Sequence, residues 1–130
     1  MPPSTDVSGD ALQGLRILVV EDEALVAMLV EDMLGDLGCE VLGPVGGVRQ
    51  ALELLEQEKP AAAILDVNLG GEPVYPVADA LLAAGTPFVL ATGYGELGVA
   101  DPYKGVPVLQ KPFEQGELER CVRRAVEARS

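Results

Sequence analysis

The chain has 130 residues, of which 48% are hydrophobic, and it carries 21 acidic and 9 basic residues for a net charge of −12. This length predicts one domain with a substantial core, and no apolar run is long enough to cross a bilayer. The acidity excludes nucleic acid as a partner, and the absence of histidine and of any CxxC motif excludes a zinc site and a histidine-based catalytic triad.

Residues 1–14 (MPPSTDVSGDALQG) are polar, contain Pro, Ser and Gly, and lack the basic start and apolar centre of a secretory signal. We therefore expect a flexible N-terminal tail at 1–14, a single folded domain at 15–130 and a cytoplasmic location. Cys39 and Cys121 are expected to be core residues rather than a disulfide. With nucleic acid and membrane excluded, we expect a monomer whose partners are proteins or cations.

Strands and helices alternate along the first half of the chain. Three short apolar runs predict buried strands, at 15–20 (LRILVV), 39–43 (CEVLG) and 61–67 (AAAILDV). After the first of them, apolar residues recur at every fourth position and predict a helix with a wide apolar face. This face is marked by Leu25, Leu29, Met33 and Leu37, with Val26, Val30 and Leu34 beside them. A second helix is predicted at 47–58, with Pro60 as its stop.

The second half continues this alternation. A Gly- and Pro-rich loop at 69–73 (LGGEP) leads into a helix of about ten residues around 77–82. Two further strands are predicted, at 86–91 (TPFVLA) and 106–109 (VPVL). An amphipathic helix ends the chain, and its apolar stripe consists of Leu118, Cys121, Val122, Ala125 and Val126.

The segment 93–105 (GYGELGVADPYKG) interrupts this alternation of strands and helices. It contains four glycines and a proline, and each Gly inside a helix costs about 1 kcal/mol relative to Ala. We therefore expect a mobile loop here, in which the fourth helix is short or absent.

Strands that are apolar throughout belong to a parallel sheet covered by helices on both faces. Right-handed crossovers then favour an α/β, flavodoxin-like, doubly wound sheet of five parallel strands in the order 2-1-3-4-5. In such a sheet, ligands bind beyond the carboxyl ends of the strands. Polar residues stand at the ends of four of the strands, namely Glu21 and Asp22, Asp66, Thr92, and Lys111.

Three carboxylates in one pocket repel each other, by up to ~4 kcal/mol per pair at about 4 Å and an effective dielectric constant of about 20. A divalent cation relieves this repulsion, and carboxylate oxygens favour Mg²⁺ or Ca²⁺. The hydroxyl of Thr92 and the ammonium of Lys111 are suitable donors to a phosphoryl oxygen. Together these groups indicate phosphoryl transfer onto a carboxylate, with Asp66, at the end of a central strand, as the acceptor.

Four short motifs in this order, VVEDE, ILDVNL, ATG and KPF, resemble the receiver domain of bacterial two-component response regulators over residues 15–130. The 44-residue step from Asp22 to Asp66 is typical of that family. The stretch PFVLATGYG (87–95) further resembles the PFxFATGY signature of the FATGUY single-domain subfamily, with Leu90 in place of the second Phe. The loop LGGEPVYPVADAL is also similar to that subfamily.

The resemblance implies a role for each matching residue. Asp66 would accept the phosphoryl group, and Thr92 and Lys111 would bind its oxygens. Mg²⁺ would be held by the side chains of Asp22 and Asp66 and the backbone carbonyl of Asn68, with Glu21 acting through a water. The Lys111–Pro112 peptide bond is usually cis in this family, and only proline accepts cis readily.

Two positions depart from the family pattern. Glu21 stands where Asp is commoner, and Val108 stands where an aromatic switch residue is often found. The switch must then use other residues, and the candidates are Thr92, Gly93, Tyr94 and Tyr103. We expect phosphorylation to pull Thr92 inward and to reorder the segment that follows it.

The implied function is a stand-alone phosphoacceptor in a His–Asp phosphorelay, phosphorylated on Asp66 by a histidine kinase or phosphotransfer protein with Mg²⁺, and linked through the FATGUY likeness to stress signalling. Its output would be contact with an unknown downstream protein, or it would act as a sink that removes phosphoryl groups from a kinase. No enzyme activity is expected beyond Mg²⁺-dependent self-phosphorylation and autodephosphorylation.

Two alternatives stay open. The first is a pseudo-receiver that binds partner proteins without phosphate, and the complete set of site residues argues against it. The second is a metal-dependent phosphatase of similar topology. Such enzymes have a second catalytic acid two residues after the nucleophile, where this chain has Asn68.

Overall fold

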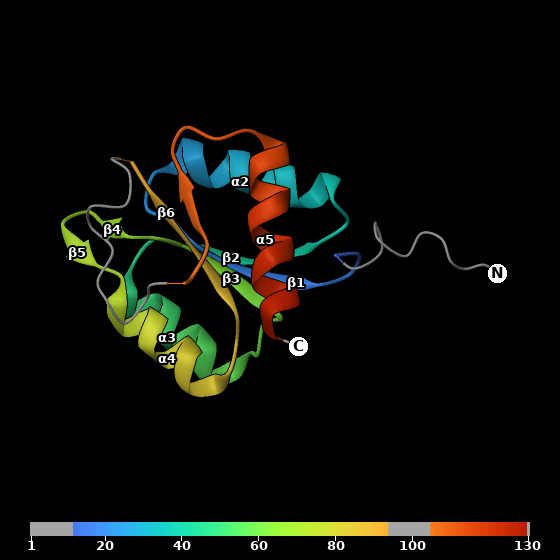
Figure 1. The fold of residues 1–130 in the computed structure, drawn as a ribbon. Helices are drawn as coiled ribbons and strands as arrows, with labels where there is room; N and C mark the ends of the chain where they lie inside the picture. The colour runs from blue at the N-terminus through green and yellow to red at the C-terminus, as the bar shows by residue number, and fades with distance from the viewer. Residues whose placement is uncertain (1–11, 94–104, 130) are drawn as a thin grey trace.

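Five parallel strands form the central sheet of the computed structural model, which describes residues 12–93 and 105–129 (Figure 1). Along the sheet the strands follow the order β2 (Glu40–Val45), β1 (Arg16–Val20), β3 (Ala62–Asp66), β6 (Phe88–Thr92) and β7 (Val108–Gln110). Numbered by their order in the chain, these strands give 2-1-3-4-5. The predicted α/β, flavodoxin-like topology is therefore confirmed.

Helices cover both faces of this sheet. In the described part of the chain, α2 (Ala24–Asp36) and α5 (Gln115–Arg129) lie on one face, and α3 (Val48–Gln57) and α4 (Tyr75–Ala84) lie on the other (Figure 1). Each face has its own apolar cluster because alternate residues of a strand point to opposite faces. Within β1, Leu18 and Val20 pack under α3 and α4, whereas Ile17 and Val19 pack under α2 and α5.

Strand β3 is buried along its whole length. Its neighbours β1 and β6 pair with it on either side, and the helices cover it above and below. This position explains why its sequence is an apolar run without alternation. It also places Asp66, the last residue of β3, beside Ala91 near the end of β6.

The stretch expected to be a loop at 69–73 contains a small β-hairpin. Strands β4 (Asn68–Leu69) and β5 (Glu72–Pro73) pair antiparallel, with Gly70 and Gly71 between them. Both glycines have positive φ, +60° and +93°, as a two-residue hairpin turn requires. Leu69 is buried in the core, and this anchors the hairpin to the domain.

Helix α2 buries only part of the wide apolar face that the sequence predicts. Its buried residues are Ala27, Val30 and Leu34. Leu25 and Leu29, which mark the predicted stripe, are 77% and 56% exposed. The sheet covers only part of the wide apolar face, and the rest of that face is exposed.

The expected flexible tail at 1–14 is too long by its last three residues, 12–14. Leu12 is fully buried and packs with the residues under α2 and α5. The thiol of Cys39 donates to the carbonyl oxygen of Leu12 at 3.3 Å, and the amide of Gly14 donates to the carbonyl of Gly38 at 2.7 Å. Residues 12–14 are therefore part of the fold, and residues 1–11 lie outside the described residues.

Other details differ from the sequence expectation by small amounts. Cys39 is buried as predicted, but Cys121 is only half-buried. The Lys111–Pro112 peptide bond is cis, and so is Gly43–Pro44, which the sequence did not lead us to expect. Residues 94–104, on which the expectation of a mobile loop rests, lie outside the described residues. Among the residues described, no helix is both long and apolar enough to cross a membrane.

Candidate functional site

The predicted site residues meet at the carboxyl edge of the sheet. Glu21 directly follows β1, Asp66 and Thr92 end β3 and β6, and Lys111 directly follows β7. A cavity of about 880 Å³ opens at this edge, and its polar lining includes Asp22, Asp66, Asn68, Thr92, Gly93 and Lys111. Because β1, β3 and β6 are neighbours, residues far apart in the sequence share this one cavity.

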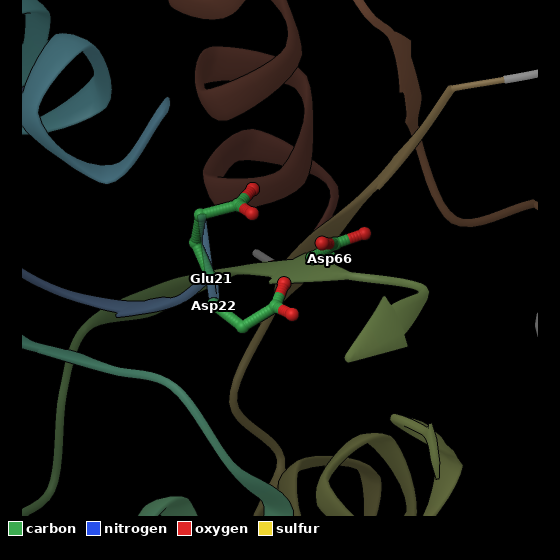
Figure 2. A group of neighbouring side chains, drawn as sticks. All are labelled: Glu21, Asp22 and Asp66. Carbon is green, nitrogen blue, oxygen red and sulfur yellow. The ribbon is translucent and has the colours of Figure 1, made fainter. Parts of the chain in front are cut away.

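Three carboxylates form the acidic part of the site. Glu21, Asp22 and Asp66 each offer one oxygen, and these oxygens lie within 4.8 Å of one another. Figure 2 shows the Asp22 side chain extending from the end of β1 towards Asp66, with Glu21 beside it. Glu21 and Asp66 are buried, whereas Asp22 is exposed to the cavity. A set of hard oxygen donors at this spacing fits a divalent cation such as Mg²⁺.

Lys111 joins the buried carboxylates. Its Nζ lies 2.8 Å from Oε1 of Glu21 and 3.3 Å from Oδ2 of Asp66. Burial lowers the pKa of Lys111, but the hydrogen bond to Glu21 and the charges of both carboxylates more than offset that effect, so the pKa is raised above its ordinary value. The backbone holds this arrangement because the Lys111 amide donates to the carbonyl oxygen of Thr92 at 2.8 Å. Lys111 is therefore a charged hydrogen-bond donor that is held in place between Glu21 and Asp66.

Asp66 has a carboxyl group with altered acidity. Burial, together with the nearby negative charge of Glu21, raises its pKa from the ordinary 3.8 to about 6, although Lys111 acts in the opposite direction. The backbone amide of Asn68 donates to Oδ1 of Asp66 at 3.2 Å and favours the charged form. Asp66 is thus ionised at neutral pH in an environment that makes its negative charge costly, as suits a nucleophile or a cation ligand.

Two further contacts fix the loops around the carboxylates. Oε2 of Glu21 accepts a hydrogen bond from the backbone amide of Glu23 at 3.1 Å, just before α2 begins. Oδ1 of Asn68 accepts one from the amide of Gly71 at 2.7 Å, across the turn of the hairpin. Asn68, Gly70 and Gly71 line the cavity, so the β4–β5 hairpin forms one of its walls. Sequence reasoning placed Asn68 at the site but missed the hairpin.

The opposite wall of the cavity is apolar and was also missed. It includes Val26, Leu29 and Met33 of α2 and Phe113 after β7. Leu25 and Met28, 77% and 59% exposed, extend this apolar surface along α2. The four-residue spacing in the sequence was the available signal, but that spacing predicts only an apolar helix face and not what the face contacts.

The switch candidates are only partly described. Thr92 is buried at the end of β6, and Gly93 is exposed at the rim of the cavity. Tyr94 and Tyr103 lie outside the described residues. The expectation that one of these tyrosines replaces an aromatic residue at Val108 stays a prediction.

Residues 17–123 match the family of response regulator receiver domains. Among curated proteins, the transcriptional regulatory protein PdtaR of Mycobacterium tuberculosis is 31% identical over 131 residues, a match that covers 95% of this chain. The chain spans 62% of the length of that relative.

Solved structures give the same result. SdrG from Sphingomonas melonis Fr1 is 45% identical with a TM-score of 0.75, over 89% of this chain and 96% of that one. A BeF3-activated conformation of SdrG from Pseudomonas melonis Fr1 is 43% identical with a TM-score of 0.75, over 87% and 98%. The receiver domain of PhyR from Erythrobacter litoralis is 27% identical with a TM-score of 0.80, over 90% and 93%. The family match covers most of the chain and the acidic residues meet where its fold binds ligands, so the chain belongs to the response regulator receiver domain family.

Proposed function

We propose that this receiver domain is a phosphoacceptor response regulator, phosphorylated on Asp66 in a Mg²⁺-dependent reaction by a histidine kinase or phosphotransfer protein. The observation that carries the proposal is that one cavity at the strand ends collects Asp22, Asp66, Thr92 and Lys111. Receiver domains are in general signalling modules rather than metabolic enzymes. The same role is proposed here.

In the proposed reaction, an oxygen of Asp66 attacks the phosphorus of a phosphohistidine, so that a P–O bond forms as the P–N bond breaks. The product is an acyl phosphate on Asp66, and the histidine leaves with the electrons of the broken bond. Lys111, already 3.3 Å from Asp66, donates to a phosphoryl oxygen. The hydroxyl of Thr92 is the second donor on the protein side.

The carboxylates are suited to hold Mg²⁺, which when bound supplies positive charge that offsets the charge of the phosphoryl oxygens. Asp22 and Asp66 would be its side-chain ligands, with the backbone carbonyl of Asn68 and, through a water, Glu21. Burial and the charge of Glu21 raise the pKa of Asp66, and such an ion would offset both effects by favouring the charged carboxylate. The contact of Glu21 with Lys111 supports an indirect role for Glu21.

The apolar surface on α2 supports a protein as the phosphodonor. Leu25, Met28 and Leu29 are exposed on α2, and Leu29 also lines the cavity that contains Asp66. A group of large exposed apolar side chains at one place usually marks a contact with another protein. A helical phosphodonor that covers these three residues would bring its phosphohistidine close to Asp66.

We further assign the chain to the FATGUY subfamily, on the PFVLATGYG stretch, and infer a role in stress signalling through that likeness. The similar protein SdrG has a BeF3-activated conformation, which makes beryllofluoride a suitable probe for this chain. We expect activation to draw Thr92 inward and to change the segment after Gly93. Amide exchange of that segment with and without beryllofluoride tests this; equal protection in both states would contradict it.

Intact-protein mass spectrometry after incubation with acetyl phosphate and Mg²⁺ tests the proposed function. One phosphoryl adduct is expected on the wild type and none on Asp66→Asn. Asp36→Asn, which removes an exposed carboxylate at the end of α2, is the matched control and should retain the adduct. A wild type that forms no adduct with acetyl phosphate or with any histidine kinase of its source would favour the pseudo-receiver alternative.

A further inference from the structure

The β4–β5 hairpin brings a glycine next to a carboxylate of the cation site. A methyl group placed on Gly70 would lie 3.3 Å from Oδ2 of Asp22, tighter than ordinary van der Waals contact. No other heavy atom outside the adjoining residues lies within 4 Å of that position. Gly70 and Asp22 come from different loops, one after β3 and one after β1, and both line the cavity.

The hairpin has little freedom to move away from Asp22. Leu69, the residue before the turn, is buried in the core, and Val74, just after β5, is fully buried. The amide of Val74 donates to the carbonyl oxygen of Val67 at 3.1 Å and closes the base of the hairpin. Across the tip, the amide of Gly71 donates to Oδ1 of Asn68 at 2.7 Å. A side chain at position 70 would therefore displace Asp22 rather than the hairpin.

We propose that Gly70 is a positioning residue for the divalent cation: because it has no side chain, the Asp22 carboxylate keeps the place from which it binds the ion. The inference rests on the proposed Mg²⁺-dependent function. Mg²⁺ requires near-ideal octahedral geometry with oxygens at about 2.0–2.1 Å. Asp22 is exposed and can move by a few tenths of an ångström without unfolding the domain, but a shift of that size moves a ligand oxygen out of place.

A glycine away from the cavity provides a matched control. Gly85, which follows α4, has φ of +73° and Gly70 has φ of +60°, so an L-residue at either position meets the strain of a positive φ. A methyl group on Gly85, however, meets no heavy atom within 4 Å, and Gly85 does not line the cavity that contains Asp66. Gly85→Ala therefore introduces a similar backbone strain without the contact to Asp22.

Calorimetric titration with Mg²⁺, in the absence of any phosphodonor, tests the proposal on the whole chain. Gly70→Ala should weaken Mg²⁺ binding by about tenfold, the lower end of the range for residues that orient metal ligands. Gly85→Ala should bind Mg²⁺ as the wild type does, and Asp22→Asn should lose most of the affinity. Equal affinities of Gly70→Ala and the wild type, or an equal loss in Gly85→Ala, would overturn the role of Gly70. A wild type that binds no Mg²⁺ would instead overturn the proposed function, and with it this inference.

A double-mutant cycle decides the question if Gly70→Ala is too unstable to titrate. Gly70→Ala and Asp22→Ala are made separately and together, and their unfolding in denaturant is compared without metal. If the methyl group acts on the Asp22 carboxylate, the loss of stability caused by Gly70→Ala should shrink in the Asp22→Ala background. Purely additive losses would overturn the contact on which the proposal depends.

Discussion

The ammonium of Lys111 lies 2.8 Å from the carboxylate of Glu21, and both side chains are largely buried. This contact is shorter than the 3.3 Å that separates the same ammonium from Asp66. Glu21 also accepts a hydrogen bond from the backbone amide of Glu23, so both of its carboxylate oxygens have a partner. The side chain of Glu21 thus holds the lysine beside Asp66, the proposed phosphoacceptor.

Lys111→Met should destabilise the domain because it leaves the buried carboxylates of Glu21 and Asp66 without their cation. The loss is expected to be about 3 kcal/mol, as for breaking a buried ion pair from one side. Unfolding in urea without divalent cations measures it. Arg49→Met is the control, since Arg49 and Glu53 are 91% and 61% exposed, and its effect should stay below about 1 kcal/mol. Equal losses in the two variants would contradict this account of the site.

The contribution of Asp66 to stability without metal should fall as the pH rises from about 4 to about 6. Asp66 has a pKa of about 6 in the folded chain and 3.8 ordinarily, so in this window it binds more protons in the native state than in the unfolded state. Its contribution to stability then decreases with pH, by on the order of 3 kcal/mol across the window. Urea unfolding of the wild type and Asp66→Asn, in the presence of a chelator, isolates the contribution of Asp66. The difference between the two should grow in favour of Asp66→Asn as the pH rises; a constant difference would contradict the prediction.

The fold and most of the site could be predicted because both follow from patterns along the chain. Apolar runs gave the strands, their alternation with helices gave the parallel sheet, and the polar residues at strand ends had to meet at one edge. Asp66 illustrates this: it is a charged residue at the end of a fully buried strand.

Other features could not be predicted because the pattern allows two outcomes. Leu25 and Leu29 have the spacing of a core stripe, and the sequence does not tell how far the sheet covers a wide apolar face. Leu12 follows Ala11 in a short stretch that is otherwise polar or Gly-rich, with no periodicity to mark Leu12 as buried. The two-residue strands of the hairpin are too short for a periodic signal, although Gly70–Gly71 is a typical hairpin pair.

Replacing Leu25 and Met28, which are exposed on α2 and do not line the cavity, together by Gln should slow phosphotransfer from the partner kinase by about tenfold. The reason is that side chains that anchor an interface contribute most of its affinity. Gln is a good helix former, so α2 should remain intact. Phosphorylation by acetyl phosphate should be unchanged. The control is Leu82→Gln, because Leu82 is 49% exposed on α4, on the other face of the sheet. Equal rates of phosphotransfer to the double variant and to Leu82→Gln would show that the α2 surface is not the docking site.

Leu12→Ala should destabilise the domain by about 2–5 kcal/mol, the usual cost of truncating a buried leucine. The reason is that Leu12, 1% exposed, belongs to the apolar cluster under α2 and α5. Thermal or urea unfolding measures the loss. Leu25→Ala, at an exposed position of α2, should cost less than about 1 kcal/mol. A small effect at Leu12 would restore the sequence expectation of a loose tail through residue 14.

The two walls of the cavity belong to separate pieces of secondary structure, the hairpin on one side and α2 on the other. Under the proposed function, changes in the hairpin would act on the bound ion, whereas changes on the outer face of α2 would act on the choice of phosphodonor. Selection, or a protein engineer, could then change ion affinity and donor specificity separately in this chain.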